Sequence, residues 1–116
     1  MEEQRLLRRA EMLKALVHPI RLRILAELLK TPKCVNAMHE LLKVRQTGIS
    51  QHLTVLKHAG LVAFRQNGAS RCYYLPQPTL VKAVFELIKR DYPVVNPRKV
   101  RREIDRALRR RARAGK

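Results

Sequence analysis

Residues 46–62 have the sequence QTGISQHLTVLKHAGLV, and this stretch decides which fold the chain can adopt. Ile49, Leu53 and Leu56 recur at three- and four-residue spacing, which predicts a helix with one apolar face and a polar opposite face. The pattern stops at Ala59-Gly60, because glycine readily takes the left-handed conformation that ends a helix. A short polar segment before residue 46 separates this helix from the one before it.

Three further apolar periodicities precede this helix. They predict helices over Glu3–Val17, from Pro19 to Lys30 and from Val35 to about Lys43. His18-Pro19 and Thr31-Pro32-Lys33 separate them, because the residue before a proline is pushed out of the helical region. The third and fourth helices are therefore short and joined by a tight turn.

After Gly60 the apolar period changes from that of a helix to that of a strand. Residues 61–65 and 71–75 alternate in the manner of strands, and Asn67-Gly68 between them predicts a hairpin. Pro76 and Pro78 close the hairpin, and apolar residues from Leu80 to Ile88 then predict a fifth helix. The pattern predicts a mainly α fold with a β-hairpin, arranged as a helix-turn-helix with a wing.

Size and charge limit the classes of protein that this chain can belong to. It has 116 residues, 26 Lys and Arg against 9 Asp and Glu, and a formal charge of +17. That length is enough for one domain, and the charge predicts a polyanionic partner. No apolar run approaches the ~18 residues needed to cross a bilayer, and the N-terminus does not resemble a signal peptide, so we expect a cytoplasmic protein with reduced thiols.

The C-terminal end differs in composition from the rest. Ten basic and two acidic residues lie between Arg98 and Lys116. We therefore expect residues 1–92 to form the domain for DNA binding and dimerisation, and residues 93–116 a basic extension. Val95-Asn96-Pro97 resembles a helix start, and Val100, Ile104 and Leu108 form a thin apolar stripe, which predicts a marginal helix that orders on docking or binding.

Several segments together resemble the ArsR/SmtB family of bacterial winged helix-turn-helix repressors. They are HPIRLRIL at 18–25, ISQHLTVLKHAGLV at 49–62, and the segment from Asn67-Gly68 to Tyr73-Tyr74. The resemblance covers roughly residues 15–88 and implies DNA-binding regulation of transcription. The first and fifth helices carry apolar surface that a monomer of this size would not cover, so we expect a homodimer formed through these two helices.

Because the core residues fix the inner face of the fourth helix, the outer face is the one expected in the major groove. The residues expected to contact DNA there and on the wing are Gln46, Thr47, Ser50, Gln51, His52, Thr54, Lys57, Arg65, Asn67 and Arg71. Lys43 and Arg45 are further candidates for phosphate contacts, and Gly48 for a close backbone approach. The alternatives are an ordinary solvated helix face and, for His52, a structural histidine between the core and groove faces.

Metal sensing, which many family members perform, is not expected here. One family site uses a Cys-x-Cys pair where this chain has Cys34-Val35-Asn36, and the fifth helix has Glu86 but no histidine. His18, His39 and His58 lack partners at ligand spacing, so we expect surface or capping roles for them. No cofactor is expected, and no catalytic constellation suggests an enzyme.

Cys34 and Cys72 remain as candidates for a redox sensor. In the winged-helix topology the residues before the third helix can pair with the second wing strand, which brings these two cysteines together. Lys33 and a helix start beside Cys34, and Arg71 beside Cys72, favour the thiolate and hence oxidation or sulfur transfer. The alternative is that both are inert packing residues.

The sequence therefore supports two functions of different class. The first is a homodimeric, sequence-specific repressor that binds palindromic double-stranded operator DNA in the nucleoid and is released by a chemical signal. The second is a nonspecific nucleic-acid-binding protein that coats the chromosome or associates with RNA, motivated by the basic extension. No membrane partner is expected.

Overall fold

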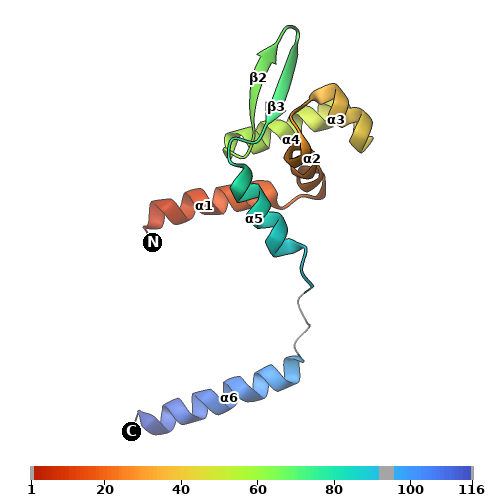
Figure 1. Cartoon of the computed structure of the whole chain (residues 1–116). Coiled ribbons are helices and arrows are strands. Elements are labelled where there is room, and N and C mark those ends of the chain that lie inside the picture. Colours follow the sequence, from red (N-terminus) through yellow and green to blue (C-terminus); the bar gives the residue numbers. More distant parts are fainter. Residues whose placement is uncertain (1, 92–95, 116) are drawn as a thin grey trace.

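The computed structural model describes residues 2–91 and 96–115 of the chain. Figure 1 shows a body of short helices from which a hairpin projects, followed by a long C-terminal helix. The elements are α1 (Glu3–Leu16), α2 (Pro19–Lys30), β1 (Lys33–Cys34), α3 (Val35–Leu42), α4 (Gln46–His58), β2 (Ala63–Asn67), β3 (Ser70–Tyr74), α5 (Pro78–Ile88) and α6 (Pro97–Ala114). The predicted fold class, mainly α with a β-hairpin, is confirmed.

The end of α4 explains why the first strand of the hairpin begins later than predicted. Gly60 has a φ of +78°, and its amide donates to the Lys57 carbonyl. The Leu61 amide donates to the Leu56 carbonyl over 2.9 Å, so the helix ends in a Schellman motif. Leu61 and Val62, predicted as strand residues, belong to this buried turn instead.

The hairpin of β2 and β3, which we call the wing, has a tighter turn than predicted. Asn67 pairs with Ser70, so only Gly68 and Ala69 form the turn rather than the five residues 66–70. Gly68 has a φ of +62°, a conformation that an L side chain rarely adopts. The strands therefore reach almost to the tip of the wing.

A third strand ties the wing to the helical body. The sheet has the order β1-β3-β2, and both pairings are antiparallel. In the β1–β3 ladder Lys33 is opposite Tyr73 and Cys34 is opposite Cys72. The predicted pairing of the segment before α3 with the second wing strand is confirmed.

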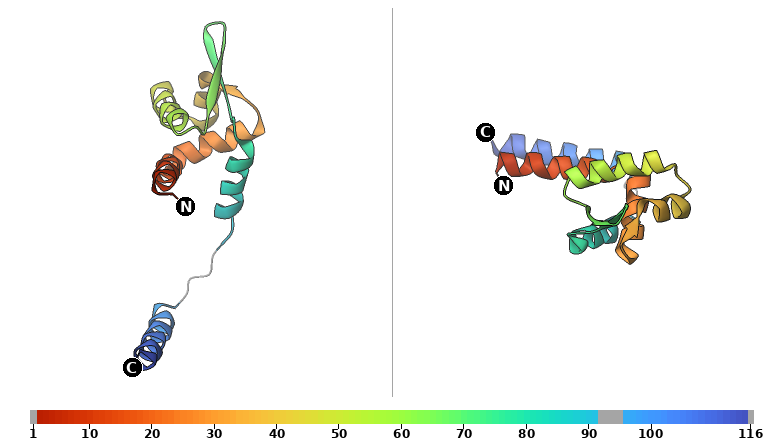
Figure 2. Two further views of the ribbon diagram at one scale, coloured as in Figure 1. Left: turned by 90° about the vertical axis from the view of Figure 1, so that its left-hand side faces the viewer. Right: turned by 90° about the horizontal axis from the view of Figure 1, so that it is seen from above.

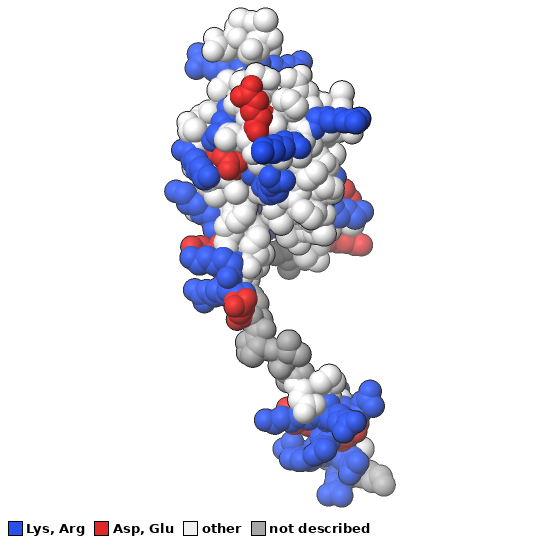
Figure 3. Space-filling view, turned by 90° about the vertical axis from the view of Figure 1, so that its right-hand side faces the viewer, with Lys and Arg blue, Asp and Glu red and all other residues white. Residues whose placement is uncertain are grey.

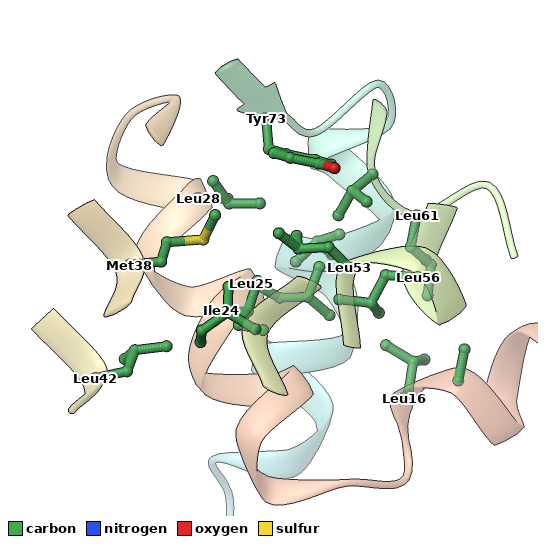
Figure 4. Close-up of a cluster of buried hydrophobic side chains, with 14 residues drawn as sticks. Leu16, Ile24, Leu25, Leu28, Met38, Leu42, Leu53, Leu56, Leu61 and Tyr73 are labelled. Carbon is green, nitrogen blue, oxygen red and sulfur yellow. The ribbon is translucent and has the colours of Figure 1, made fainter. Parts of the chain in front are cut away.

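The core is almost entirely aliphatic and holds α4 against the other helices. Figure 4 shows Leu53 and Leu56 of α4 surrounded by side chains of α1, α2, α3 and the wing. The side chains with less than 2% exposure are Ile24, Leu25, Met38, Ile49, Leu53, Leu56, Leu61 and Val81. All three residues predicted for the inner face of α4 are among them, so its opposite face is available for a partner.

The C-terminal helix α6 begins as the sequence predicted. Asn96 caps it, because the side-chain oxygen accepts a hydrogen bond from the Arg98 amide at 3.0 Å. None of its residues is buried, and both Figure 1 and the left view of Figure 2 show it apart from the helical body. Val95 and the predicted domain boundary at residues 92 and 93 lie outside the described residues.

Candidate nucleic-acid interface

The exposed face of α4 carries the polar residues expected at a major groove. Gln46, Thr47, Ser50, Gln51 and Thr54 are all exposed. They face outward because Ile49, Leu53 and Leu56 occupy the core. The helix therefore presents donors and acceptors at its N-terminal half, where a recognition helix contacts base edges.

Backbone geometry in the turn before α4 sets how that helix leaves α3. Lys43 ends α3 in the left-handed region with a φ of +56°, and its amide donates to the His39 carbonyl. A Cβ atom on Gly48 would lie 3.3 Å from a methyl carbon of Val44, tighter than an ordinary contact. The close packing against Val44 therefore accounts for a glycine at position 48 without the expected close approach of the backbone to DNA.

Part of the predicted face borders a hollow between α3, α4 and the wing. Its volume is about 560 Å³. The predicted residues Gln46, Ser50, Thr54 and Arg71 line it, together with Asn36 and Gln66. The Gln46 amide nitrogen donates to the Asn36 Oδ1 atom at 2.9 Å, and the Thr54 hydroxyl donates to the Ser50 carbonyl at 2.9 Å.

Asn36 and Gln66 were not predicted from the sequence. Asn36 belongs to the first turn of α3. The sequence could have indicated it, because the tight turn between the third and fourth helices makes these helices neighbours. Gln66 fell in the predicted loop, but it is a strand residue opposite Arg71. Both side chains border the same hollow as the exposed face of α4.

Two cations of the predicted interface stack on one aromatic ring. The Lys57 ammonium lies 4.5 Å from the centre of the Phe64 ring, and the Arg71 guanidinium lies 4.4 Å from it. These cation–π contacts join the end of α4 to the base of the wing. Arg65 and Asn67 belong to a second hollow, about 590 Å³ in volume, which Cys72 also lines. The structure thus divides the predicted wing residues between two hollows.

His52 lies between the recognition face and the core, and its contacts favour the structural alternative. The Arg21 side chain donates from Nε to the His52 Nδ1 atom at 3.3 Å, and the His18 ring centre is 4.4 Å away. Burial lowers the pKa of His52 below its usual 6.5, and the nearby His18 and Arg21 charges act in the same direction. The neutral imidazole is the form that accepts the hydrogen bond from Arg21.

The same arginine connects α4 to the end of α1. Its Nη1 atom donates to the Ala15 carbonyl at 3.3 Å and to the Lys14 carbonyl at 3.4 Å. His18 caps α2, since its Nδ1 atom accepts from the Ile20 amide at 3.1 Å. The capping role expected for His18 is confirmed, and the residues between α1 and α2 contact the recognition helix directly.

The two cysteines are neighbours in the backbone, but their side chains make different contacts. The Cys34 sulfur caps α3 by accepting from the Ala37 amide at 3.4 Å. Both thiols are free and partly buried. The cations expected to activate them are engaged elsewhere: Lys33 Nζ donates to the Glu27 carbonyl at 2.6 Å, and Arg71 stacks on Phe64. The basic residue directly opposite Cys72 in the β2–β3 ladder is instead Arg65.

Electrostatics across the molecule favour an anionic partner. Figure 3 shows lysine and arginine side chains spread over one side of the body and concentrated on α6, with few acidic ones among them. Within residues 2–91 and 96–115, no group of three His, Cys, Asp or Glu side chains is placed to hold a metal ion. None of the helices in the same residues is long and apolar enough to cross a membrane.

Comparison with known proteins agrees with this geometry. The family model described as "Bacterial regulatory protein, arsR family" matches residues 18–63. The chain is 38% identical over 85 residues to the transcriptional activator HlyU of Vibrio cholerae, covering 73% of this chain and 78% of that protein. It belongs to the ArsR family. Chains of this family are DNA-binding regulators of transcription, and the winged helix-turn-helix described above is their DNA-binding fold.

The relatives differ in length, and some are named as activators of transcription and others as repressors. The transcriptional repressor SmtB of Mycobacterium tuberculosis is 35% identical over 78 residues, which are 67% of this chain and 58% of that protein. The chain thus spans less than two thirds of this mycobacterial relative. Among solved structures, HlyU of Vibrio cholerae superposes with a TM-score of 0.68 at 27% identity, covering 77% of this chain and all of that one. A homodimeric winged helix-turn-helix DNA-binding domain from Mycobacterium bovis, described as a possible ArsR-family regulator, superposes with a TM-score of 0.65 at 25% identity, covering 83% of this chain and 97% of that one.

Proposed function

We propose that this ArsR-family chain is a homodimeric, sequence-specific repressor of transcription that binds a palindromic operator. The observation that carries the proposal is the exposed polar face of α4 beside the wing, with Ser50 and Thr54 bordering the hollow between them. Gln51 and Ser50 are assigned to base edges, because paired amide contacts distinguish adenine and hydroxyl groups reach several bases. Gln46, Thr47 and Thr54 complete this surface.

Phosphate contacts are assigned to the basic residues around the recognition helix. The Lys57 and Arg71 cations stack on the Phe64 ring, and Arg65 and Asn67 border the second hollow of the wing. A wing in this position follows the neighbouring backbone or enters the minor groove. These residues supply affinity that depends on salt and not on sequence.

Dimerisation is assigned to α1 and α5. Large apolar side chains are exposed on both helices, including Leu7 at 62%, Leu13 at 54% and Ile88 at 49%. Burying them against a second copy gains hydrophobic free energy that a monomer forgoes. A two-fold axis places two recognition helices about 34 Å apart, one turn of the duplex, and this spacing fits a palindromic operator. Residues 1–92 then form the winged helix-turn-helix domain for DNA binding and dimerisation, and residues 93–116 a basic extension.

The signal that releases the operator is assigned to the two cysteines. A two-electron oxidant of the peroxide class removes one hydrogen from each thiol, a bond forms between the sulfur atoms of Cys34 and Cys72, and the peroxide is reduced to two waters. A polysulfide gives the same bond by a second route: one thiolate takes a sulfur atom from the polysulfide, which leaves one sulfur shorter, and the other thiolate then attacks the inner sulfur of the resulting persulfide as hydrosulfide leaves. Either route changes how the segment before α3 is attached to the wing. As a regulator of this kind, the protein works on the chromosome in the cytoplasm and has no enzymatic activity.

A binding competition tests the proposal against a nonspecific nucleic-acid-binding protein. Duplexes enriched from a random pool are compared with scrambled duplexes of equal length and composition at one salt concentration. We expect the enriched site to be palindromic and to bind about 10³-fold or more tighter than the scrambled duplex. Equal affinity for both duplexes contradicts the proposal and favours the nonspecific alternative.

A further inference from the structure

The C-terminal helix α6 has two chemically distinct sides. With 100° between successive residues, seven basic side chains lie within an arc of about 120°. They are Arg98, Lys99, Arg102, Arg106, Arg109, Arg110 and Arg113, which we call the basic face. Val100, Ile104 and Leu108 lie on the opposite side of the helix.

Acidic residues do not interrupt the basic face. In the same projection Glu103 falls beyond one edge of the arc and Asp105 beyond the other. Asp105 borders a small hollow with Arg102, Arg106 and Arg109. The helix as a whole carries nine basic and two acidic residues, so its field is strongly positive.

The length of α6 matches a run of phosphates. Its 18 residues extend about 27 Å, while successive phosphates on one strand of a duplex are about 3.4 Å apart along the axis. A helix of this length therefore lies beside about eight phosphates of one strand. Because none of the residues of α6 is buried, all seven side chains of the basic face are available to a partner.

The apolar side of α6 is unsuited to a membrane surface. Arg111 falls between Val100 and Ile104 in the projection, so a cation interrupts the apolar stripe. The helix contains no aromatic residue, and its three large aliphatic side chains cover a narrow arc. Interfacial membrane helices bury a broad apolar face that usually includes aromatic residues. The charge complementarity therefore favours a duplex backbone over lipid.

We infer that α6 is a second DNA-binding element, which holds duplex phosphates through its basic face without regard to sequence. The inference rests on the proposed function only in taking DNA as the partner of the molecule. The winged helix then reads the operator, and α6 adds affinity for DNA of any sequence.

A matched pair of double variants of the full chain tests this inference. Arg102→Gln with Arg106→Gln removes two charges from the basic face, whereas Arg101→Gln with Arg111→Gln removes two charges from the apolar side. Glutamine keeps helix propensity close to that of arginine, and circular dichroism checks that both variants fold. Binding of each to random-sequence duplex is measured over a series of salt concentrations.

We expect the two variants to differ in salt dependence. Each phosphate that loses its cation reduces the slope of log K against log salt by about 0.9, so the basic-face variant should lose about two units of slope and the control variant almost none. Equal reductions in both variants overturn the inference, because they show a general charge effect. Unchanged slopes in both variants also overturn it.

Two further measurements separate this inference from its alternatives. The ratio of operator affinity to random-DNA affinity tests the proposed function alone. A basic-face variant should keep that ratio and lose affinity for both DNAs, so the ratio does not depend on the role of α6. Double-stranded RNA of the same length and vesicles of anionic phospholipid serve as competitors. If wild type binds either competitor more tightly than random DNA, and the basic-face variant loses that preference, α6 is a site for the competitor and the assignment to DNA is overturned.

Discussion

Cys34 lies directly opposite Cys72 in the antiparallel ladder between β1 and β3. Residues opposed in this way have Cα atoms about 4.5–5.5 Å apart, within the limit of about 7 Å for a disulfide. The Cys34 sulfur accepts from the Ala37 amide in the reduced chain, so turning this side chain toward Cys72 would remove the N-cap of α3. The two residues are therefore adjacent in the backbone, while Cys34 borders the hollow between α3, α4 and the wing and Cys72 borders the second hollow.

Peroxide treatment is expected to link Cys34 to Cys72 within one chain and to weaken operator binding about fivefold or more. Mass spectrometry identifies the linkage, and titration of a labelled operator measures affinity before and after oxidation. Cys34→Ser is a suitable control because serine caps helices well and cannot form the bond. Equal affinity in reduced and oxidised wild type, with the bond present, rules out a thiol switch.

Alanine at Ser50 or Gln51 is expected to weaken operator binding by about 1–3 kcal/mol for a side chain that reads a base, and random-DNA binding much less. Both side chains lie on the exposed face of α4. Gln77→Ala is the matched control, since Gln77 is exposed at the start of α5 and makes no side-chain capping bond. If operator and random DNA lose affinity equally at one salt concentration, these residues contact phosphates instead.

Lys43→Gly is expected to stabilise the fold while weakening DNA binding. A non-glycine residue in the left-handed region costs about 1–2 kcal/mol, so urea denaturation should show a gain of about 1 kcal/mol. Removal of the ammonium should reduce the salt slope of DNA binding by about 0.9 if Lys43 contacts a phosphate. Lys43→Ala separates the two effects, because it removes the charge and keeps the backbone strain. A stability gain in the alanine variant would contradict this explanation.

Because of His52, the free energy of unfolding is expected to decrease when the pH drops below the usual pKa of histidine. Its pKa in the folded chain is lower than 6.5, so the unfolded chain binds more protons as the pH falls through that value. Stability is therefore fully present above the unfolded value and is lost progressively as the pH falls toward and through the folded one. Thermal unfolding across this range should depend less on pH in His52→Gln than in wild type. His58→Gln, an exposed change on the same helix, is expected to behave as wild type.

Periodicity predicted most of the fold because each helix has a clear apolar face. The positions of Pro19 and Gly60 marked a helix start and a helix end correctly. The strand bounds were less accurate, since Leu61 and Val62 are apolar in either structure and only the Schellman bonds place them in a turn. Apolar pattern alone does not contain that backbone geometry.

Side-chain partners were harder to predict than the face on which each residue lies. The outer face of α4 followed from its core residues, but the contact between Arg21 and His52 joins positions far apart in sequence. Lys33 was adjacent to Cys34 in sequence, yet its ammonium caps the end of α2. Adjacent residues of a strand point to opposite faces, so sequence neighbours there need not interact.

The Arg21 guanidinium holds the last carbonyls of α1 and the ring of His52 together. In the proposed dimer, α1 sets the orientation of the two copies relative to each other, and α4 is the recognition helix of each copy. Because the Arg21 side chain contacts both helices, the distance between the two recognition helices is fixed within the dimer and adapts little to the DNA. The dimer should therefore not bind operators with one base pair inserted between the half-sites, so the protein discriminates the spacing of half-sites as well as their sequence.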